Sequence, residues 1–303
     1  MNVGYVGLGS MGGALARRLQ LTHPLRVFDL DPAAVAKMAE RGATPCASLR
    51  ELGEACDVIL LCLPTSDHVR AAIFGAEGVA AGAKPGTLLV DQSTGDPNAT
   101  RAMAAELAGR GVALVDAPVS GGAAGAEAGT ISIMVGAGPE EHARVAPILA
   151  AISSNVFHAG DVGAGQVMKL VNNLISGAQR LLTMEGMALA AKNGIAPTRA
   201  REILVAGGAR NVFLEKFMEP IIRGKLEVGF TLGLMHKDVR LACDLGGASG
   251  VPMFFGNLAR EFYQMCISDR GAQAEVHTAA IVIDRLAGTQ VVPPGTAARQ
   301  EQQ

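Results

Sequence analysis

Short apolar runs alternate with Ala-rich, helix-forming segments throughout the first half of the chain. The helix-forming segments include residues 33–41 and 98–110, and the apolar runs lie at residues 3–6, 25–28, 58–63, 88–90, 112–115, 131–135 and 156–157. Apolar residues follow one another in these runs without polar alternation, which is typical of a parallel sheet with helices on both faces. The sequence therefore predicts a doubly wound α/β domain over residues 1–162.

The pattern changes after about residue 160, where apolar residues recur at spacings of three and four and β-branched clusters largely disappear. One long helix is predicted from about residue 163 to Asn193 and Gly194, a natural C-terminal stop. Further helices are predicted at residues 197–206, 214–223, 232–245, 253–267 and 275–286. We therefore expect an all-helical domain over residues 163–289, joined through the long helix. A disordered tail is predicted over residues 290–303, which contain Pro293 and Pro294.

Composition and charge exclude several classes of protein. The 303 residues include 26 Lys and Arg against 28 Asp and Glu, without a basic block, so a nucleic-acid partner is not expected. No stretch of roughly 20 apolar residues could span a membrane, and no secretory signal follows Met1. Five cysteines without a Cys-x-x-Cys pair argue against a disulfide framework or structural zinc. We expect a cytoplasmic protein without a metal ion.

A glycine-rich turn with the sequence Gly-Leu-Gly-Ser-Met-Gly occupies residues 7–12, between the first apolar run and a predicted helix. In a Rossmann-type domain the first glycine of G-x-G-x-x-G permits a tight turn, the second lets the backbone approach a pyrophosphate, and the third packs helix against strand. Asp29 ends the next strand, where a carboxylate binds the ribose 2′-hydroxyl, although alone it could cap the helix that begins near Pro32. Residues 30–36 contain no Arg or Lys, and Asp29 and Asp31 would repel a 2′-phosphate. The predicted cofactor is therefore NAD rather than NADP.

A Ser-Gly-Gly sequence, Ser120, Gly121 and Gly122, follows the predicted strand at residues 112–115. A hydroxyl and unobstructed backbone N–H groups beyond the carboxyl edge of a sheet suit a small carboxylate. An ordinary glycine turn explains the same residues equally well, so the sequence leaves both interpretations open.

Lys169 and Asn173 are four residues apart near the start of the long predicted helix and therefore lie on one face of it. An ammonium and an amide so placed can converge on one substrate oxygen, and a lysine desolvated in a cleft can act as acid or base. A solvated lysine beside a surface asparagine is the alternative, and spacing alone does not decide between them.

Four segments in this order resemble the signature regions of the β-hydroxyacid dehydrogenase family, at residues 7–12, 116–122, 163–173 and 236–239. The resemblance covers about residues 1–286, and the combination is far more specific than any single motif. It implies an NAD-dependent oxidoreductase acting on the CH–OH group of a short hydroxy acid. It also implies a Rossmann-type domain followed by a helical domain similar to that of 6-phosphogluconate dehydrogenases.

The same resemblance implies roles for individual residues. Lys169 would be the general acid/base, and Asn173 would orient the reacting oxygen. The substrate would be bound by Ser120, Gly121, Gly122 and Lys237, with Phe230 and Asp238 as a supporting wall. The cofactor would be bound by Gly7, Leu8, Gly9, Ser10, Met11, Gly12, Asp29, Leu63, Pro64, Thr94 and Lys237.

Differences from related families limit the reactions that the chain is expected to catalyse. 6-Phosphogluconate dehydrogenases carry an acidic residue where Ser176 stands, imine reductases usually lack Lys169, and sulfolactaldehyde reductases have an altered Ser-Gly-Gly site that accepts a sulfonate. We therefore expect a dehydrogenase of the 3-hydroxyisobutyrate type. Reduction of 2-hydroxy-3-oxopropionate (tartronate semialdehyde) or of another small semialdehyde is the alternative. Arg210 could meet a second acidic group of the substrate or lie solvated in a loop.

An alternative to the enzyme interpretation is a protein that senses a dinucleotide and catalyses no reaction. It predicts loss of Lys169 or Asn173 and an added charged or low-complexity segment for a partner. The sequence shows neither feature, so the enzyme interpretation is favoured.

The long predicted helix also indicates the oligomeric state. Its apolar residues occupy much of its circumference, which is more than one small domain can cover. We therefore predict a homo-oligomer, either a dimer or a tetramer.

Overall fold

The computed structural model of the chain describes residues 1–296. The chain divides into two compact units, Met1–Leu170 and the residues from Val171 on. The division falls inside the long helix α9 (Ala164–Lys192), after Leu170 rather than after residue 162, because the first turns of this helix pack on the first unit.

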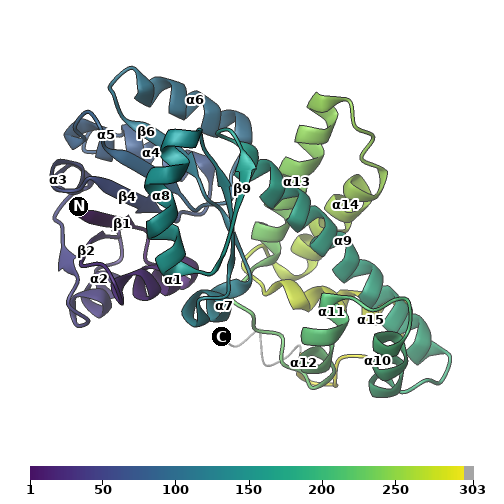
Figure 1. The fold of residues 1–303 in the computed structure, drawn as a ribbon. Coiled ribbons are helices and arrows are strands. Elements are labelled where there is room, and N and C mark those ends of the chain that lie inside the picture. The colour runs from purple at the N-terminus through teal and green to yellow at the C-terminus, as the bar shows by residue number, and fades with distance from the viewer. Residues whose placement is uncertain (297–303) are drawn as a thin grey trace. The chain divides into compact units, whose positions relative to one another are not determined.

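The first unit contains a sheet that has nine strands within the described residues (Figure 1). The strands are β1 (Val3–Val6), β2 (Leu25–Phe28), β3 (Thr44–Pro45), β4 (Val58–Leu61), β5 (Leu88–Asp91), β6 (Ala113–Asp116), β7 (Val119–Ser120), β8 (Ser132–Gly136) and β9 (Asn155–Gly160). Their order is β3-β2-β1-β4-β5-β6-β8-β7, and β9 pairs with β8. The strands from β3 to β6 in this order are parallel, as predicted. β8 is antiparallel to both β6 and β7, so the complete sheet is mixed.

The register of the parallel strands brings their carboxyl ends to one edge of the sheet. Val6 pairs with Leu61, Leu61 with Asp91, and Asp91 with Asp116. The segments that follow β1, β4, β5 and β6 therefore leave the sheet at the same edge. Ligands of open α/β sheets bind outside this edge.

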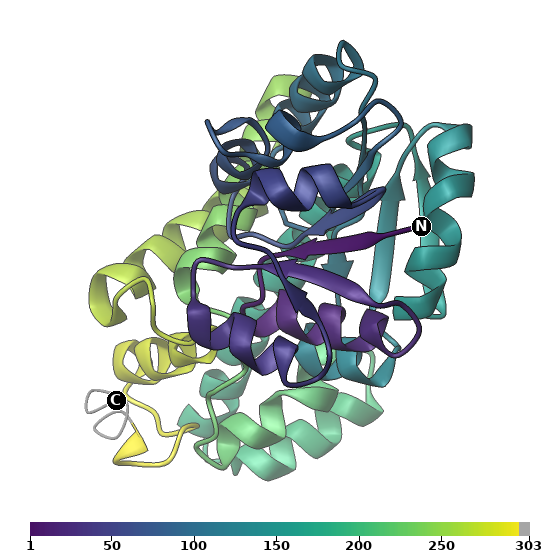
Figure 2. The same ribbon diagram turned by 90° about the vertical axis from the view of Figure 1, so that its left-hand side faces the viewer.

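Helices cover both faces of the sheet (Figures 1 and 2). They are α1 (Ser10–Gln20), α2 (Pro32–Ala39), α3 (Leu49–Ala55), α4 (Ser66–Phe74), α5 (Val79–Gly82), α6 (Pro97–Ala108), α7 (Gly122–Ala128) and α8 (Pro139–Ile152). Successive strand residues point to opposite faces. Tyr5 accordingly lies in a core with Leu15 of α1, and Val6 lies in a second core with Ile73 of α4. The predicted doubly wound architecture is confirmed.

The second unit is helical, as predicted. After α9 it contains α10 (Pro197–Ala206), α11 (Val212–Lys216), α12 (Met218–Ile222), α13 (Leu232–Ser249), α14 (Phe254–Arg270), a 3₁₀ turn η1 (Val276–Thr278) and α15 (Ala279–Ala287). The helix predicted at residues 214–223 is instead two short helices, because Phe217 has a φ of −114° and interrupts the run. α9 ends where predicted, before Asn193 and Gly194, and the φ of Gly194 is +83°.

The chain after α15 differs from the predicted disordered tail. The carboxylate of Asp284 accepts hydrogen bonds from the backbone N–H groups of Val291, at 3.0 Å, and Val292, at 2.8 Å. Both valines are buried in the core of the second unit. The prediction of disorder is therefore wrong for residues 290–296, because two apolar side chains and a buried acceptor fix a segment that its prolines suggested was frayed. Residues 297–303 of the predicted tail lie outside the described residues.

Three general findings complete the fold. Within residues 1–296, none of the helices has both the length and the apolar character needed to cross a membrane. The same part of the chain holds no group of three or more His, Cys, Asp or Glu side chains suited to a metal ion. The five cysteines, all of which the structure describes, form no disulfide.

Candidate active site

The turn between β1 and α1 depends on two glycines for its shape. Gly7 has a φ of +88°, and a Cβ atom on it would lie 2.3 Å from the carbonyl oxygen of Cys62. A Cβ atom on Gly12 would lie 2.0 Å from the carbonyl oxygen of Gly7, so the helix passes directly over the turn. A Cβ atom on Gly9 would meet no atom of residues 1–296 within 4 Å. The backbone at Gly9 is therefore open to a bound group, as the second glycine of a nucleotide-binding turn requires.

The N-terminus of α1 begins at this turn. Gly9 is the N-cap residue, and no side chain of the described residues caps this end of the helix. The first turn contains no acidic residue. Backbone N–H groups and the positive end of the helix dipole can therefore act on an anion such as a pyrophosphate.

Asp29 connects the end of β2 to the glycine turn. Its Oδ2 accepts a hydrogen bond from the N–H of Leu8 at 2.5 Å, and its Oδ1 accepts one from the N–H of Asp31 at 2.8 Å. Asp31, not Asp29, caps α2, because its Oδ1 accepts the N–H of Ala33 at 2.9 Å. The capping role considered for Asp29 thus belongs to Asp31. The structure leaves Asp29 at the glycine turn, where a ribose-binding carboxylate is expected.

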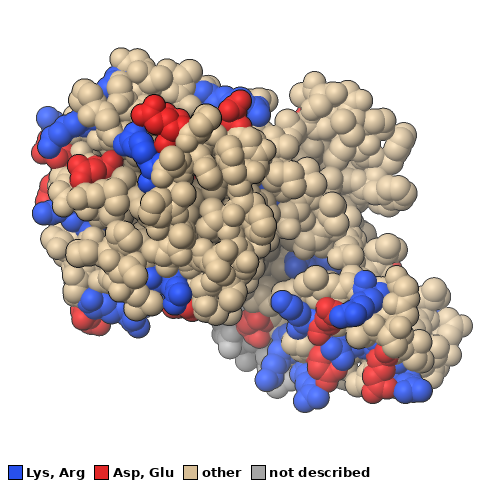
Figure 3. Space-filling model, viewed as in Figure 1, with Lys and Arg blue, Asp and Glu red and all other residues tan. Residues whose placement is uncertain are grey.

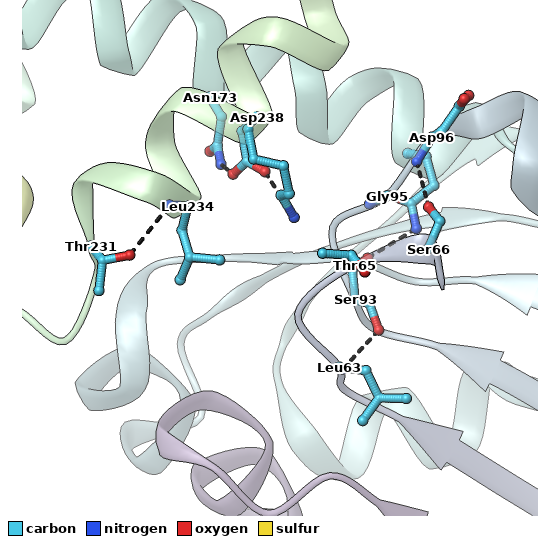
Figure 4. Close-up of polar contacts among 12 residues, drawn as sticks. Leu63, Thr65, Ser66, Ser93, Gly95, Asp96, Asn173, Thr231, Leu234 and Asp238 are labelled. Carbon is cyan, nitrogen blue, oxygen red and sulfur yellow. Dashed lines mark hydrogen bonds and ion pairs between the residues drawn. The ribbon is translucent and has the colours of Figure 1, made fainter. Parts of the chain in front are cut away.

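The segments after β4 and β5 are joined by hydrogen bonds (Figure 4). The N–H of Leu63 donates to Oγ of Ser93 at 2.8 Å, and the N–H of Ser93 donates to Oδ1 of Asp91 at 2.9 Å. Pro64 and Thr94, which were predicted to border the cofactor, come directly after Leu63 and Ser93 in these two segments. Both segments are therefore held at the ligand-binding edge of the sheet.

The Ser-Gly-Gly sequence lies at the end of β7 and the start of α7. Gly121 and Gly122 are exposed and have φ values of +139° and +74°, a region that favours glycine. A Cβ atom on Gly122 would meet no described atom within 4 Å. The backbone here is thus accessible, which is compatible with the predicted carboxylate site as well as with a plain turn.

Lys169 is 7% exposed, so the alternative of a solvated surface lysine does not apply. The start of α9, which carries it, is held by Asp116 at the end of β6. The Asp116 carboxylate accepts the N–H of Gly163 at 2.6 Å and the N–H of Gln166 at 2.8 Å. Burial raises the pKa of Asp116, while these two hydrogen bonds act in the opposite direction. Asp116 is not among the site residues predicted from the sequence, although its place at a strand end before a Gly-rich segment is visible there.

Asn173, on the next turn of α9, belongs to a buried polar group of the second unit. Its Nδ2 donates to Oδ2 of Asp238 at 2.5 Å (Figure 4). Nζ of Lys237 lies 3.2 Å from Oδ1 of the same carboxylate. The Asp238 side chain is 2% exposed. Asp238, predicted only as part of a supporting wall, therefore holds both Asn173 and Lys237.

Two further residues named from the sequence, Phe230 and Arg210, have surroundings of their own. Phe230 packs, partly buried, against the core of the second unit. Arg210 has an exposed side chain that pairs with Glu215. This arrangement favours the solvated-loop interpretation of Arg210.

Comparisons with known protein families cover most of the chain. Residues 2–160 match the family described as the NAD binding domain of 6-phosphogluconate dehydrogenase. Residues 163–283 match the family described as NAD-binding of NADP-dependent 3-hydroxyisobutyrate dehydrogenase.

Individual proteins of known name are similar over nearly the same length. The chain is 37% identical over 267 residues to 2-(hydroxymethyl)glutarate dehydrogenase of Eubacterium barkeri, with 87% of this chain and 88% of the relative covered. It is 37% identical over 273 residues to 3-hydroxyisobutyrate dehydrogenase of Pseudomonas aeruginosa, with 87% and 91% covered. Among solved structures, 3-hydroxyisobutyrate dehydrogenase of Mycobacterium tuberculosis with L-serine has a TM-score of 0.82 at 29% identity, with 93% and 98% covered.

Proposed function

The chain belongs to the β-hydroxyacid dehydrogenase family of NAD(P)-dependent oxidoreductases, and from this premise we propose that it oxidises a short 3-hydroxy acid of the 3-hydroxyisobutyrate type with NAD. The observation that carries the proposal is the burial of Lys169 on α9, one turn before the buried Asn173. A buried lysine next to an amide suits proton transfer at a hydroxyl group. The exposed backbone of Gly121 and Gly122 suits the carboxylate of the same substrate.

The proposed reaction divides the chemistry between cofactor and protein. NAD, when bound at the glycine turn, supplies the acceptor for the hydride that leaves the hydroxyl-bearing carbon. Lys169, as a neutral amine, accepts the hydroxyl proton, and in the reverse direction its ammonium returns that proton to the carbonyl oxygen. The Asn173 amide is held by its hydrogen bond to Asp238, and in the proposed reaction it orients the reacting oxygen.

A panel of substrates tests the proposed substrate preference. The purified protein is given NAD with 3-hydroxyisobutyrate, L-serine, 2-(hydroxymethyl)glutarate and glycerate, the alcohol that corresponds to tartronate semialdehyde. We expect the highest kcat/KM for 3-hydroxyisobutyrate. A higher value for glycerate supports the reductase alternative. Measurable NAD binding without turnover of any compound contradicts the enzyme proposal and favours a dinucleotide sensor.

Asp29 is predicted to set the preference for NAD over NADP. A hydrogen bond to a charged group contributes about 1.5–3 kcal/mol, or roughly 10- to 100-fold. Asp29→Ala should reduce the ratio of kcat/KM for NAD to that for NADP by about this factor. Asp29→Asn keeps an acceptor for the N–H of Leu8 and so separates the loss of charge from the loss of the turn contact. A wild-type preference for NADP would show that the assignment of Asp29 is wrong.

The proposed homo-oligomer follows from apolar surface on the second unit. On α14, Phe254 is 80% exposed, Phe255 83% and Leu258 69%. On α9, Leu182 is 70% exposed. Figure 3 shows no Lys, Arg, Asp or Glu on the visible surface of α13 and α14, whereas charged residues are dense over α10 to α12. Apolar surface of this kind is typical of protein interfaces, and a second copy of the chain is the proposed partner.

Light scattering tests the oligomer directly. We expect a mass at least twice the 31.1 kDa of one chain. A Phe255→Glu and Leu258→Glu double variant should shift the mass toward that of one chain, because charge on this surface opposes burial. A wild-type mass near one chain at working concentration would refute the prediction.

The cytoplasm is the proposed location. Four of the five cysteines are buried, and burial raises the pKa of the thiols of Cys46, Cys56, Cys243 and Cys266. Thiols of this kind serve as small apolar side chains in a reducing compartment.

A further inference from the structure

The side chain of Gln166 holds the segment that contains Thr94. Gln166 is fully buried, at 0% exposure. Its Oε1 accepts the N–H of Gly95 at 2.9 Å, and its Nε2 donates to the carbonyl oxygen of Ser93 at 2.9 Å. The amide therefore binds the backbone on both sides of Thr94, which is one of the residues expected to border the cofactor.

The backbone of the same residue is fixed on the sheet. The N–H of Gln166 donates to Asp116, and a Cβ atom on the preceding Gly165 would lie 2.3 Å from the carbonyl oxygen of Met134. The first turn of α9 thus lies directly against β8 and the end of β6. Lys169 follows Gln166 by three residues, about one helical turn.

The network continues from Gln166 toward the segment after β4. Ser93, whose carbonyl oxygen binds Gln166, accepts the N–H of Leu63 on its hydroxyl oxygen at 2.8 Å. A continuous set of hydrogen bonds therefore connects Leu63, Ser93 and Gln166, which lies one turn before Lys169 on α9. All of these residues belong to the first unit.

We propose that Gln166 is a positioning residue, which sets the place of Lys169 relative to the cofactor-bordering segments at Leu63 and Thr94. This inference rests on the proposed function, since it assumes that Lys169 transfers a proton near bound NAD. The site requires one acceptor and one donor on a side chain of this length. Glutamate lacks the donor when ionised, methionine lacks both groups, and asparagine is one methylene shorter.

The kinetic test compares Gln166→Met and Gln166→Glu with the wild-type enzyme. A misplacement of about 1 Å can cost roughly 100-fold in rate, so we expect kcat to fall by roughly 10- to 100-fold in Gln166→Met, with the Kd for NAD changed by less than about threefold. In the reductive direction, lowering the pH should restore kcat in Gln166→Glu relative to Gln166→Met. A protonated glutamate regains the donor toward Ser93, and methionine does not.

Ser153→Ala is the matched control for loss of stability. Ser153 is buried in the same unit, where its hydroxyl donates to the carbonyl oxygen of Ile131 at 2.5 Å and accepts the N–H of Asn155 at 3.1 Å. This variant should lower Tm and leave kcat per folded enzyme unchanged. If Gln166→Met keeps kcat within about twofold of the wild type, or shows the same pattern as Ser153→Ala, Gln166 has only a structural role and the inference is wrong.

Hydrogen exchange separates this inference from the proposed function. In the NAD-bound protein, Gln166→Met should increase backbone exchange at residues 93–95 and 163–169, and Ser153→Ala should not. If the wild-type protein turns over no substrate, the proposed function fails. This measurement still tests whether Gln166 holds residues 93–95 and the start of α9. Unchanged exchange in both segments would show that Gln166 does not hold them and would overturn the inference.

Discussion

The Lys169→Ala variant is expected to lower kcat by roughly 10²- to 10⁴-fold, the typical contribution of positioned acid–base catalysis, while NAD affinity stays nearly intact. The variant removes the amine from a buried position, and water at the same place is a far weaker base. The glycine turn and Asp29, which are proposed to bind NAD, do not depend on the Lys169 side chain. Steady-state kinetics with 3-hydroxyisobutyrate, together with NAD titration by fluorescence, measure the two quantities separately.

Two further variants control this prediction. Lys169→Arg should not restore kcat, because a guanidinium stays protonated and cannot act as a base at neutral pH. Asn173→Ala should cause a smaller loss, through misorientation of the reacting oxygen. If Lys169→Ala keeps a near-wild-type kcat on a good substrate, the catalytic assignment moves, and Lys237 becomes the first alternative.

Gly9→Ala is expected to weaken NAD binding by at least about 100-fold without loss of stability. The free protein has room for the new methyl group, since a Cβ atom on Gly9 meets no described atom within 4 Å, and the φ of Gly9 is −61°. The bound pyrophosphate is expected to need the same space. Loss of its contacts with the backbone N–H groups of α1 costs several kcal/mol of binding free energy, and each 1.4 kcal/mol is about tenfold in Kd. Calorimetric titration with NAD measures the loss of affinity, and a thermal melt measures whether stability is unchanged.

Two other glycines provide the comparison for Gly9→Ala. Gly247→Ala changes an exposed position of α13 that also has open space, so Tm should stay the same or rise slightly and NAD affinity should not change. Gly12→Ala should lower both, because its Cβ atom would collide with the carbonyl oxygen of Gly7. Wild-type NAD affinity in Gly9→Ala would mean that the pyrophosphate does not approach this turn.

The fold could be predicted from the sequence wherever local pattern decided it. The apolar runs gave β1 and β2 with their observed bounds, and residues 197–206 form α10 as predicted. Two-residue strands such as β3 and β7 have no pattern of their own and depend on pairing with distant neighbours. The segment with Val291 and Val292 was mispredicted for the same reason, since its order depends on Asp284 and the core.

The same distinction between local pattern and distant contacts applies to the candidate site. The glycine turn, Lys169 and Asn173 were visible as motifs, and the burial of both side chains removed the alternative of a surface pair. The groups that hold them were not visible, because Asn173 binds Asp238 65 positions away and Gln166 binds Ser93 73 positions away. Such contacts depend on strand register and helix packing, which spacing along the chain does not reveal.

Chemical rescue of Lys169→Ala is a direct test of proton transfer by Lys169. Removal of the lysine side chain leaves a space in a buried site, and a small primary amine such as ethylamine can enter it and accept the hydroxyl proton. We expect turnover of 3-hydroxyisobutyrate to rise in proportion to the concentration of free amine, and Asn173→Ala to show no such rise. Lys169→Ala enzyme that binds NAD and remains folded, yet gains no turnover from ethylamine or methylamine at any pH at which these amines are neutral, would contradict proton transfer by Lys169.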